Sequence, residues 1–142
     1  MKTIFLVHSL LELAELANKI ARELKPGTII RLDGTLGAGK THFVKALATA
    51  LGYPGHVSSP TFPLMHEYRW DDQLLVHIDF YRLETEDEVV GAGMEEHLPG
   101  EGITVVEWAG RFPKIFPSNI WQIHLAILDE TSREVTIESP DY

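Results

Sequence analysis

The sequence predicts an α/β fold in which a mixed β-sheet is flanked by helices. Three observations lead to this class. Helical and strand patterns alternate in the first half of the chain, strand patterns dominate the second half, and a glycine-rich stretch joins a strand directly to a helix. With 142 residues, 44% of them hydrophobic, the chain has room for one sizeable core, so we expect residues 1–142 to form a single domain.

The first half of the chain predicts two strands, each followed by a helix. Residues 3–7 favour a short strand, and the next segment predicts a helix that Ser9 caps and that extends to Leu24, with apolar residues three and four positions apart. A Pro-Gly pair ends this helix. The β-branched segment 28–32 then predicts a strand, and residues 40–51 predict a second helix that a glycine ends.

The second half of the chain predicts mostly strands. Five segments rich in β-branched and aromatic residues are bounded by turn residues, namely 62–70, 73–80, 102–108, 120–128 and 133–139. We expect the first two to form one hairpin and the last two to form another. The acidic segment 84–96 favours a broken helix, and the proline-spaced segment 109–119 is typical of a surface connection.

The glycine-rich stretch GTLGAGKT, residues 34–41, satisfies the pattern G-x-x-x-x-G-K-[ST]. Glycines allow successive backbone N–H groups to point inward and form an anion cradle at the start of a helix. Lys40 would then reach the β- and γ-phosphates of a nucleotide, and the Thr41 hydroxyl would join the shell of a magnesium ion. The flanking strand and helix are the context that this pattern requires, so we interpret the stretch as a nucleotide-binding P-loop.

Two acidic residues are candidates for the carboxylate that magnesium needs beside a P-loop. Asp79 ends the apolar segment LLVHID, and Glu107 ends the apolar segment ITVVE. The alternative for either residue is an ordinary carboxylate at a strand end. Two such strands in one P-loop chain favour one metal ligand and one residue that positions the attacking water, and their spacing does not say which is which.

Other polar residues have two interpretations each. The segment SSPTF, residues 58–62, is either a loop that senses the γ-phosphate or a capped turn before a strand. Ser9 is either a helix cap or a nucleotide contact, and the sequence alone favours the cap. Among the seven histidines no zinc-binding spacing occurs, so we interpret His77 and the others as ordinary strand or helix residues.

Composition excludes several classes of function. A formal net charge of −9 disfavours direct binding to the phosphates of a nucleic acid. The chain has no cysteine, which excludes disulfides and thiolate zinc sites and is compatible with a cytoplasmic location. No uninterrupted apolar run is long enough for a membrane span, and charged residues interrupt the apolar opening segment, so we expect neither a membrane anchor nor a signal peptide.

Four motifs together resemble one family. GTLGAGKT, SSPTF, HIDFYRL and VEW occur in this order, and the chain resembles over nearly its whole length the TsaE (YjeE) family, the bacterial ATPase of the system that makes threonylcarbamoyladenosine in tRNA. The resemblance implies a P-loop NTPase-like fold, a weak ATPase that uses ATP and Mg²⁺, and binding to the partner proteins TsaB and TsaD. These partners modify the adenosine beside the anticodon in ANN-reading tRNAs, so contact with tRNA is expected only through the complex.

The resemblance also implies roles for individual residues. The phosphates would be held by five consecutive residues, Gly37, Ala38, Gly39, Lys40 and Thr41. Thr41 and Glu107 would bind magnesium, and Asp79 would be the second essential carboxylate, near the metal and the water. Ser9 lies where the family has a hydroxyl residue near the nucleotide, and Arg133 in the last predicted hairpin matches a family arginine near the base.

The chain departs from the family pattern at two positions, and rival functions remain open. Thr35 stands where an aspartate is common, which leaves the phosphate cradle intact, and Gly110 stands where a glutamate is common, so this chain has no acidic side chain at that position. A small metabolite kinase would need an arginine-rich lid, but the six arginines do not cluster in pairs. A GTPase would need an N-K-x-D segment, which is absent. A nucleotide-gated binding module with negligible turnover stays possible.

Overall fold

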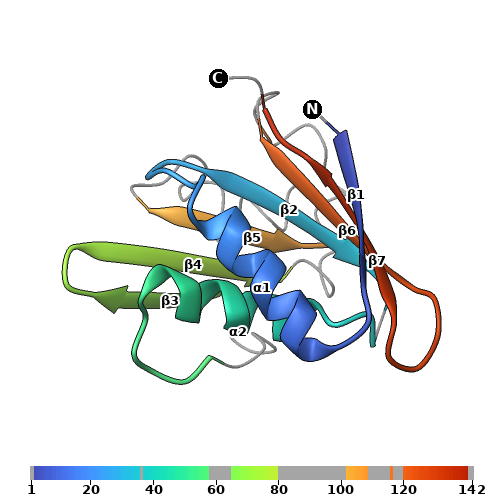
Figure 1. The fold of residues 1–142 in the computed structure, drawn as a ribbon. Helices are drawn as coiled ribbons and strands as arrows, with labels where there is room; N and C mark the ends of the chain where they lie inside the picture. The colour runs from blue at the N-terminus through green and yellow to red at the C-terminus, as the bar shows by residue number, and fades with distance from the viewer. Residues whose placement is uncertain are drawn as a thin grey trace.

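The computed structural model describes residues 2–35, 37–57, 65–79, 102–108, 116 and 120–140. Within these ranges the chain forms seven strands and two helices (Figure 1). In chain order they are β1 (Lys2–Val7), α1 (Leu10–Ala21), β2 (Ile29–Gly34), α2 (Lys40–Leu51), β3 (Met65–Trp70), β4 (Gln73–Asp79), β5 (Ile103–Glu107), β6 (Trp121–Ile127) and β7 (Arg133–Glu138).

The described strands form one mixed sheet, which confirms the predicted α/β class. Their order across the sheet is β1-β7-β6-β2-β5-β4-β3. The four central strands, β6, β2, β5 and β4, are parallel, whereas β7 and β3 run antiparallel to their neighbours. Because parallel strands end at the same edge of a sheet, residues that follow or end β2, β4 and β5 come together there. The sequence predicted the strands but not this order.

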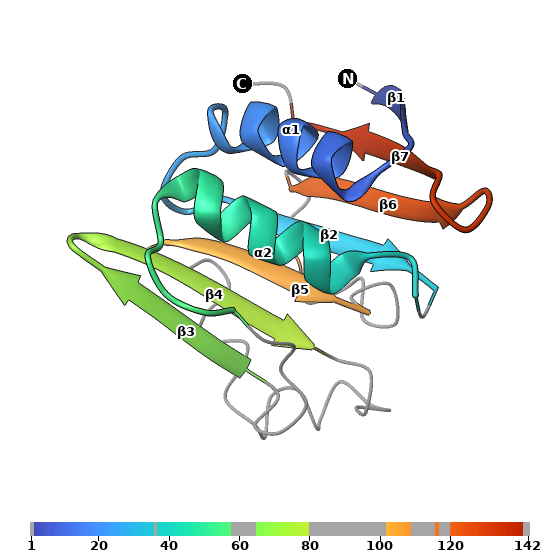
Figure 2. The same cartoon turned by 60° about the horizontal axis from the view of Figure 1, so that its bottom comes forward.

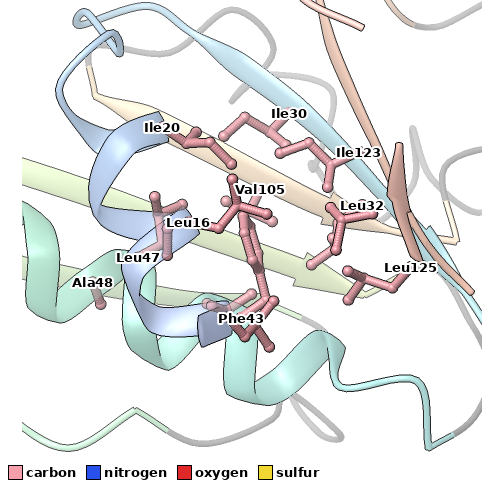
Figure 3. Packing of buried hydrophobic residues seen from close by; sticks show 14 of the residues in the cluster. Leu16, Ile20, Ile30, Leu32, Phe43, Leu47, Ala48, Val105, Ile123 and Leu125 are labelled. Carbon is pink, nitrogen blue, oxygen red and sulfur yellow. The ribbon is translucent and has the colours of Figure 1, made fainter. Parts of the chain in front are cut away.

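Both helices lie on the same face of the sheet (Figure 2). Between them and the strands lies the main hydrophobic core, to which α1 contributes Leu16 and Ile20, α2 contributes Phe43 and Leu47, and β5 contributes Val105 (Figure 3). Phe43, Leu47 and Val105 have no exposed surface at all. Burial of apolar side chains of this size, at about 1.5–3 kcal/mol each, holds both helices against the sheet.

Helix α1 begins at the predicted cap and ends earlier than predicted. The Ser9 Oγ accepts a hydrogen bond from the backbone N–H of Glu12, at 3.1 Å, and the Glu12 carboxylate accepts one from the N–H of His8. The helix ends at Ala21 rather than at Leu24, because its last turn tightens into bonds between residues three positions apart. Proline at position 26 disfavours helical backbone in Lys25, so the helix does not resume beyond this turn.

Helix α2 has the predicted bounds, Lys40–Leu51, and begins directly after the glycine-rich loop. Its N-cap is Gly39, which has a φ of 104°. This left-handed conformation is energetically unfavourable for a residue with a Cβ atom, and glycine adopts it without that penalty. The loop can therefore turn straight into the helix, whose first backbone N–H groups stay free of helical partners.

The remaining predictions divide between confirmed strands and segments outside the described residues. Both hairpins and the strand at β5 are confirmed, and apart from the start of β3, where residues 62–64 are not described, their ends differ from the prediction by at most one residue. The predicted helix at 84–96 and the loop at 58–62 lie outside the described residues, as does the connection 109–119 except for Phe116. Neither of the described helices is long and apolar enough to cross a membrane.

Candidate nucleotide-binding site

The glycine-rich loop joins the end of β2 to the start of α2, as the motif predicted. At Gly34 a Cβ atom would lie 2.7 Å from the backbone oxygen of Leu125 in β6, so only glycine fits there. The loop is closed by a hydrogen bond of 3.0 Å from the N–H of Ala38 to the carbonyl of Thr35. The loop and the first turn of α2 thus lie at the carboxyl edge of the parallel strands (Figure 2), the position at which such folds bind ligands.

Lys40, the lysine of the motif, is buried although it carries a charge. Only 7% of its surface is exposed, and its Nζ donates a hydrogen bond of 2.7 Å to the carbonyl of Gly34. Nζ lies 3.9 Å from the Oε1 atom of Glu107. Burial lowers the pKa of Lys40 below its usual value, and the nearby carboxylates of Glu107, Asp79 and Asp33 oppose that change. The ammonium is therefore held inside the loop by the loop's own backbone and by acidic neighbours.

Asp79 and Glu107, the two carboxylates predicted from their strands, are neighbours in the structure. They are directly paired residues at the carboxyl ends of the parallel strands β4 and β5. Glu107 is buried and Asp79 is half-buried. Because both raise the pKa of Lys40 by their charge, all three groups share one electrostatic site. The structure thus brings together three residues that are far apart in the sequence.

His77 was not predicted as a site residue. It lies in β4 with no exposed surface, and its Nε2 is 2.5 Å from the Oε2 atom of Glu107. The interpretation of His77 as an ordinary strand residue missed this contact. The available signal was its place two residues before Asp79, since side chains at that spacing lie on the same face of a strand.

Trp108, the residue that follows Glu107, also contributes to the site. Its ring centroid lies 4.1 Å from the Lys40 Nζ, within the range of a cation–π interaction. Its φ is 60°, a left-handed conformation that is uncommon for a bulky residue and costs about 1–3 kcal/mol. Strain of this kind is typical of functional sites. It lets the chain turn immediately after Glu107, so that the ring covers the lysine.

A cavity of about 520 Å³ borders the glycine-rich loop at Gly37, Ala38 and Gly39. Its walls come from the junction of β1 with α1, from the loop and from the turn between β6 and β7, and they include Ser9, Gly37, His42, Thr131 and Arg133. The predicted cap function of Ser9 is confirmed by its hydrogen bond to Glu12, and its hydroxyl also borders this cavity.

Arg133 links the hairpin to the glycine-rich loop. Its Nε donates to the carbonyl of Ala38 at 3.0 Å, and one terminal nitrogen donates to the carbonyl of Gly37 at 3.2 Å. The other terminal nitrogen donates to the carbonyls of Asp129 and Ser132, at 2.7 and 2.9 Å. The sequence resemblance implied a role near the base, and the structure adds that this guanidinium clamps the loop's backbone.

The chemistry of the site fits a magnesium ion. Magnesium prefers hard oxygen ligands, and it usually takes one or two from the protein and the rest from phosphates and water. Thr41 in the first turn of α2 and the carboxylates of Glu107 and Asp79 are ligands of this kind. Among the described residues no group of three or more histidine, cysteine or acidic side chains could hold a metal without such help.

Comparisons with known proteins agree with the motifs. The family model described as "Threonylcarbamoyl adenosine biosynthesis protein TsaE" matches residues 7–135. A Bacillus subtilis protein named "tRNA threonylcarbamoyladenosine biosynthesis protein TsaE" is 38% identical over 125 residues, which cover 88% of this chain and 78% of that protein. A protein of the same name from Aquifex aeolicus is 46% identical over 125 residues, covering 87% and 86%.

The fold agrees with a solved structure as well. The crystal structure of Bacillus subtilis YdiB superposes with a TM-score of 0.83 and 30% sequence identity, covering 99% of this chain and 87% of that one. The family model covers the glycine-rich loop, both carboxylates and Arg133. From the motif, the geometry around Lys40 and these matches together, it follows that this chain belongs to the TsaE family.

Proposed function

We propose that this chain is an ATP-binding, weakly ATP-hydrolysing subunit required for the threonylcarbamoyladenosine modification of ANN-reading tRNAs, acting in the cytoplasm with TsaB and TsaD. The observation that carries the proposal is the convergence of Lys40, Asp79 and Glu107 at the glycine-rich loop of a TsaE-family fold. The names of the relatives supply the pathway, and the loop supplies the chemistry of phosphate binding.

The phosphates of ATP would lie on the backbone of the glycine-rich loop, on the N–H groups of residues 37–41. Lys40 would leave the carbonyl of Gly34, to which it is bonded here, and turn its ammonium toward the phosphates. The hydrogen bond of a charged lysine to an anionic phosphate is stronger than its hydrogen bond to a neutral carbonyl. Glu107 would then keep the opposite charge beside it in the otherwise buried site.

Thr41 and Glu107 would hold magnesium, which when bound neutralises charge that develops on the phosphate oxygens. Asp79, half-buried and paired with Glu107 across the strands, would orient the attacking water. The adenosine would occupy the cavity bordered by Ser9 and Arg133. In this role Arg133 acts chiefly through the loop, because its described hydrogen bonds go to backbone carbonyls.

The proposal includes slow turnover in the isolated chain, and the reason lies in the supply of an arginine to the transferred phosphate. Fast phosphoryl transfer generally uses an arginine aimed at the transferred phosphate, often supplied by a second protein and worth about 10³ to 10⁵ in rate. Arg133 is already engaged with the loop. Arg82 and Arg111, nearest in sequence to the two carboxylates, lie outside the described residues. We therefore expect TsaB and TsaD to complete or reorganise the site.

The test is steady-state ATP turnover of the chain alone and with a TsaB and TsaD pair. We expect slow, magnesium-dependent hydrolysis that rises at least tenfold with both partners, and threonylcarbamoyladenosine formation on an ANN-reading tRNA only when this chain is present. Brisk turnover that the partners leave unchanged would contradict the proposal, and so would modification that proceeds without the chain. Binding of ATP with no hydrolysis under either condition would indicate a nucleotide-gated binding module instead.

A further inference from the structure

The proposed mechanism makes no use of His77, although it is the most deeply buried polar side chain among the described residues near the site. Its side chain has no exposed surface, and its Nε2 lies 2.5 Å from the Oε2 atom of Glu107. Side chains alternate along a strand, so Leu75, His77 and Asp79 share the face of β4 that lies beneath the helices. His77 therefore approaches Glu107 from the interior side, behind the carboxylate.

In its contact with Glu107, His77 is the hydrogen-bond donor. An ionised carboxylate accepts hydrogen bonds and cannot donate them, so with Glu107 ionised the contact places a hydrogen atom on Nε2 of His77. The Nδ1 atom is buried and has no hydrogen-bond partner among the described residues. The imidazole is thus an Nε2 donor whose single described polar contact is the Glu107 carboxylate.

The two carboxylate oxygens of Glu107 have different partners. Oε2 is bound by His77, whereas Oε1 faces Lys40 at 3.9 Å. A carboxylate that is free to rotate could exchange its oxygens, but one oxygen held from behind keeps the other directed toward the loop. Hydrogen-bonded partners behind a metal-binding carboxylate commonly fix its orientation in this way.

We propose that His77 is a positioning residue that orients the Glu107 carboxylate for magnesium bound with the nucleotide. The inference rests on the proposed function, because it assigns Glu107 to the metal. It adds a residue on a different strand from Glu107, which neither the P-loop motif nor the carboxylate itself identifies. A purely structural role, in which His77 only fills space in the sheet, is the alternative that the test must separate.

The decisive measurement is the dependence of ATP affinity on magnesium concentration in three variants. His77→Leu removes the donor and replaces it with an apolar side chain, whereas His77→Gln can bring an amide nitrogen to the position of Nε2. The control is His66→Leu, because His66 is the residue paired with His77 on β3 and bonds to Tyr68 instead. Each variant is also measured for ATP affinity in excess EDTA and for its melting temperature without nucleotide.

We expect His77→Leu to raise, by about 10- to 100-fold, the magnesium concentration that gives half of the gain in ATP affinity. Loss of a residue that hydrogen-bonds to a metal ligand usually weakens metal binding by this amount. His77→Gln should recover most of this loss, and His66→Leu should match the parent. ATP affinity in EDTA should change less than twofold in all three. Equal effects of His77→Leu with and without magnesium would overturn the proposal, as would a glutamine variant no better than the leucine variant.

A second measurement keeps the proposal testable if His77→Leu does not fold. Nitrogen NMR of the imidazoles in the metal-free parent should show the hydrogen of His77 on Nε2. Adding magnesium with a non-hydrolysable ATP analogue should shift that nitrogen and leave those of His66 in place. An Nε2 atom without a hydrogen, or an Nε2 signal that magnesium and the analogue leave unchanged, would overturn the inference.

The two proposals can fail separately. If the parent protein binds ATP with no dependence on magnesium, the proposed function fails and the inference fails with it. If the parent shows magnesium-dependent binding and His77→Leu behaves like the parent, only the positioning role of His77 is wrong.

Discussion

At the scale of single residues, the site is a group of buried charges that stabilise one another. Lys40 and Glu107 are both more than nine-tenths buried, and His77 donates to the carboxylate from the interior. Removing one member of such a group leaves another without its partner in a medium of low dielectric constant. Substitutions here therefore affect the stability of the fold as well as the binding of a nucleotide.

Lys40→Ala should weaken ATP binding by about 10- to 100-fold, because a charged hydrogen bond to phosphate is worth about 1.5–3 kcal/mol. The melting temperature without nucleotide should also fall, since Glu107 loses the ammonium 3.9 Å away. Titration calorimetry and thermal melting measure the two effects. Lys45→Ala, at a half-buried position of the same helix that does not border the carboxylates, makes the same change in charge and should match the parent in both. Unchanged ATP affinity in Lys40→Ala would refute the P-loop interpretation.

Glu107→Gln and Asp79→Asn separate the roles of the two carboxylates at nearly constant shape. We expect Glu107→Gln to abolish the gain in ATP affinity that magnesium brings, because an amide oxygen is a much weaker ligand for this ion. Asp79→Asn should lower turnover at least tenfold while changing affinity less than threefold, since a general-base or water-orienting group contributes about 10²-fold or more. ATP titrations with and without magnesium, and turnover at saturation, give both results. The opposite pattern would exchange the two assignments.

At the scale of elements, the start of α1 and the β6–β7 hairpin meet at the glycine-rich loop. Ser9 caps α1 and borders the cavity, and Arg133 of β7 donates to two carbonyls of the loop. The loop is thus supported by segments from both ends of the chain. A change at the cap can act through the stability of α1 or through the cavity, and paired substitutions distinguish these routes.

Ser9→Ala should lower the free energy of unfolding by about 1 kcal/mol, because the N–H of Glu12 loses its acceptor. Ser9→Asp keeps an acceptor at the cap, and its negative charge suits a helix N-terminus. The same charge would repel a nucleotide in the cavity, so we expect near-parental stability with ATP affinity reduced severalfold. Urea unfolding and ATP titration of both variants check this. If Ser9→Asp binds ATP as the parent does, Ser9 acts as a cap and not as a nucleotide contact.

At the scale of the whole molecule, charge limits what the chain can bind by itself. The net charge of −9 with 12 basic residues provides little to neutralise an RNA backbone, and binding to RNA generally depends on that neutralisation. Acidic residues also favour a basic protein surface as a partner. The proposed link to tRNA therefore runs through other proteins.

Retention of an ANN-reading tRNA by the chain alone should be negligible at 150 mM salt, and it should appear only when TsaB and TsaD are added. A filter-retention series from low to high salt measures this, with a basic RNA-binding protein of similar size as the positive control. Tight binding by the isolated chain at 150 mM salt would show that a local basic surface outweighs the overall charge, and the indirect route would then be wrong.

Local patterns in the sequence were enough for much of the fold and part of the site. The glycine-rich loop, the bounds of α2 and the cap at Ser9 were predictable because each depends on residues within a few positions of one another. Asp79 and Glu107 were predictable as candidates because each ends an apolar strand beside the motif. Their spacing did not say which of them would bind magnesium, and the proposed division of roles rests on the family resemblance.

The order of the strands and the contacts between distant residues were decided only by the tertiary structure. The sheet order and the register that pairs Asp79 with Glu107 arise from contacts between strands separated by long stretches of sequence. The same register brings His77 behind Glu107, and the fold of the hairpin brings Arg133 to the carbonyls of the loop. Periodicity tells which face of a strand a side chain occupies but not which strand lies beside it. The phosphate cradle was thus determined by sequence, and the buried groups that support it were determined by how distant strands align.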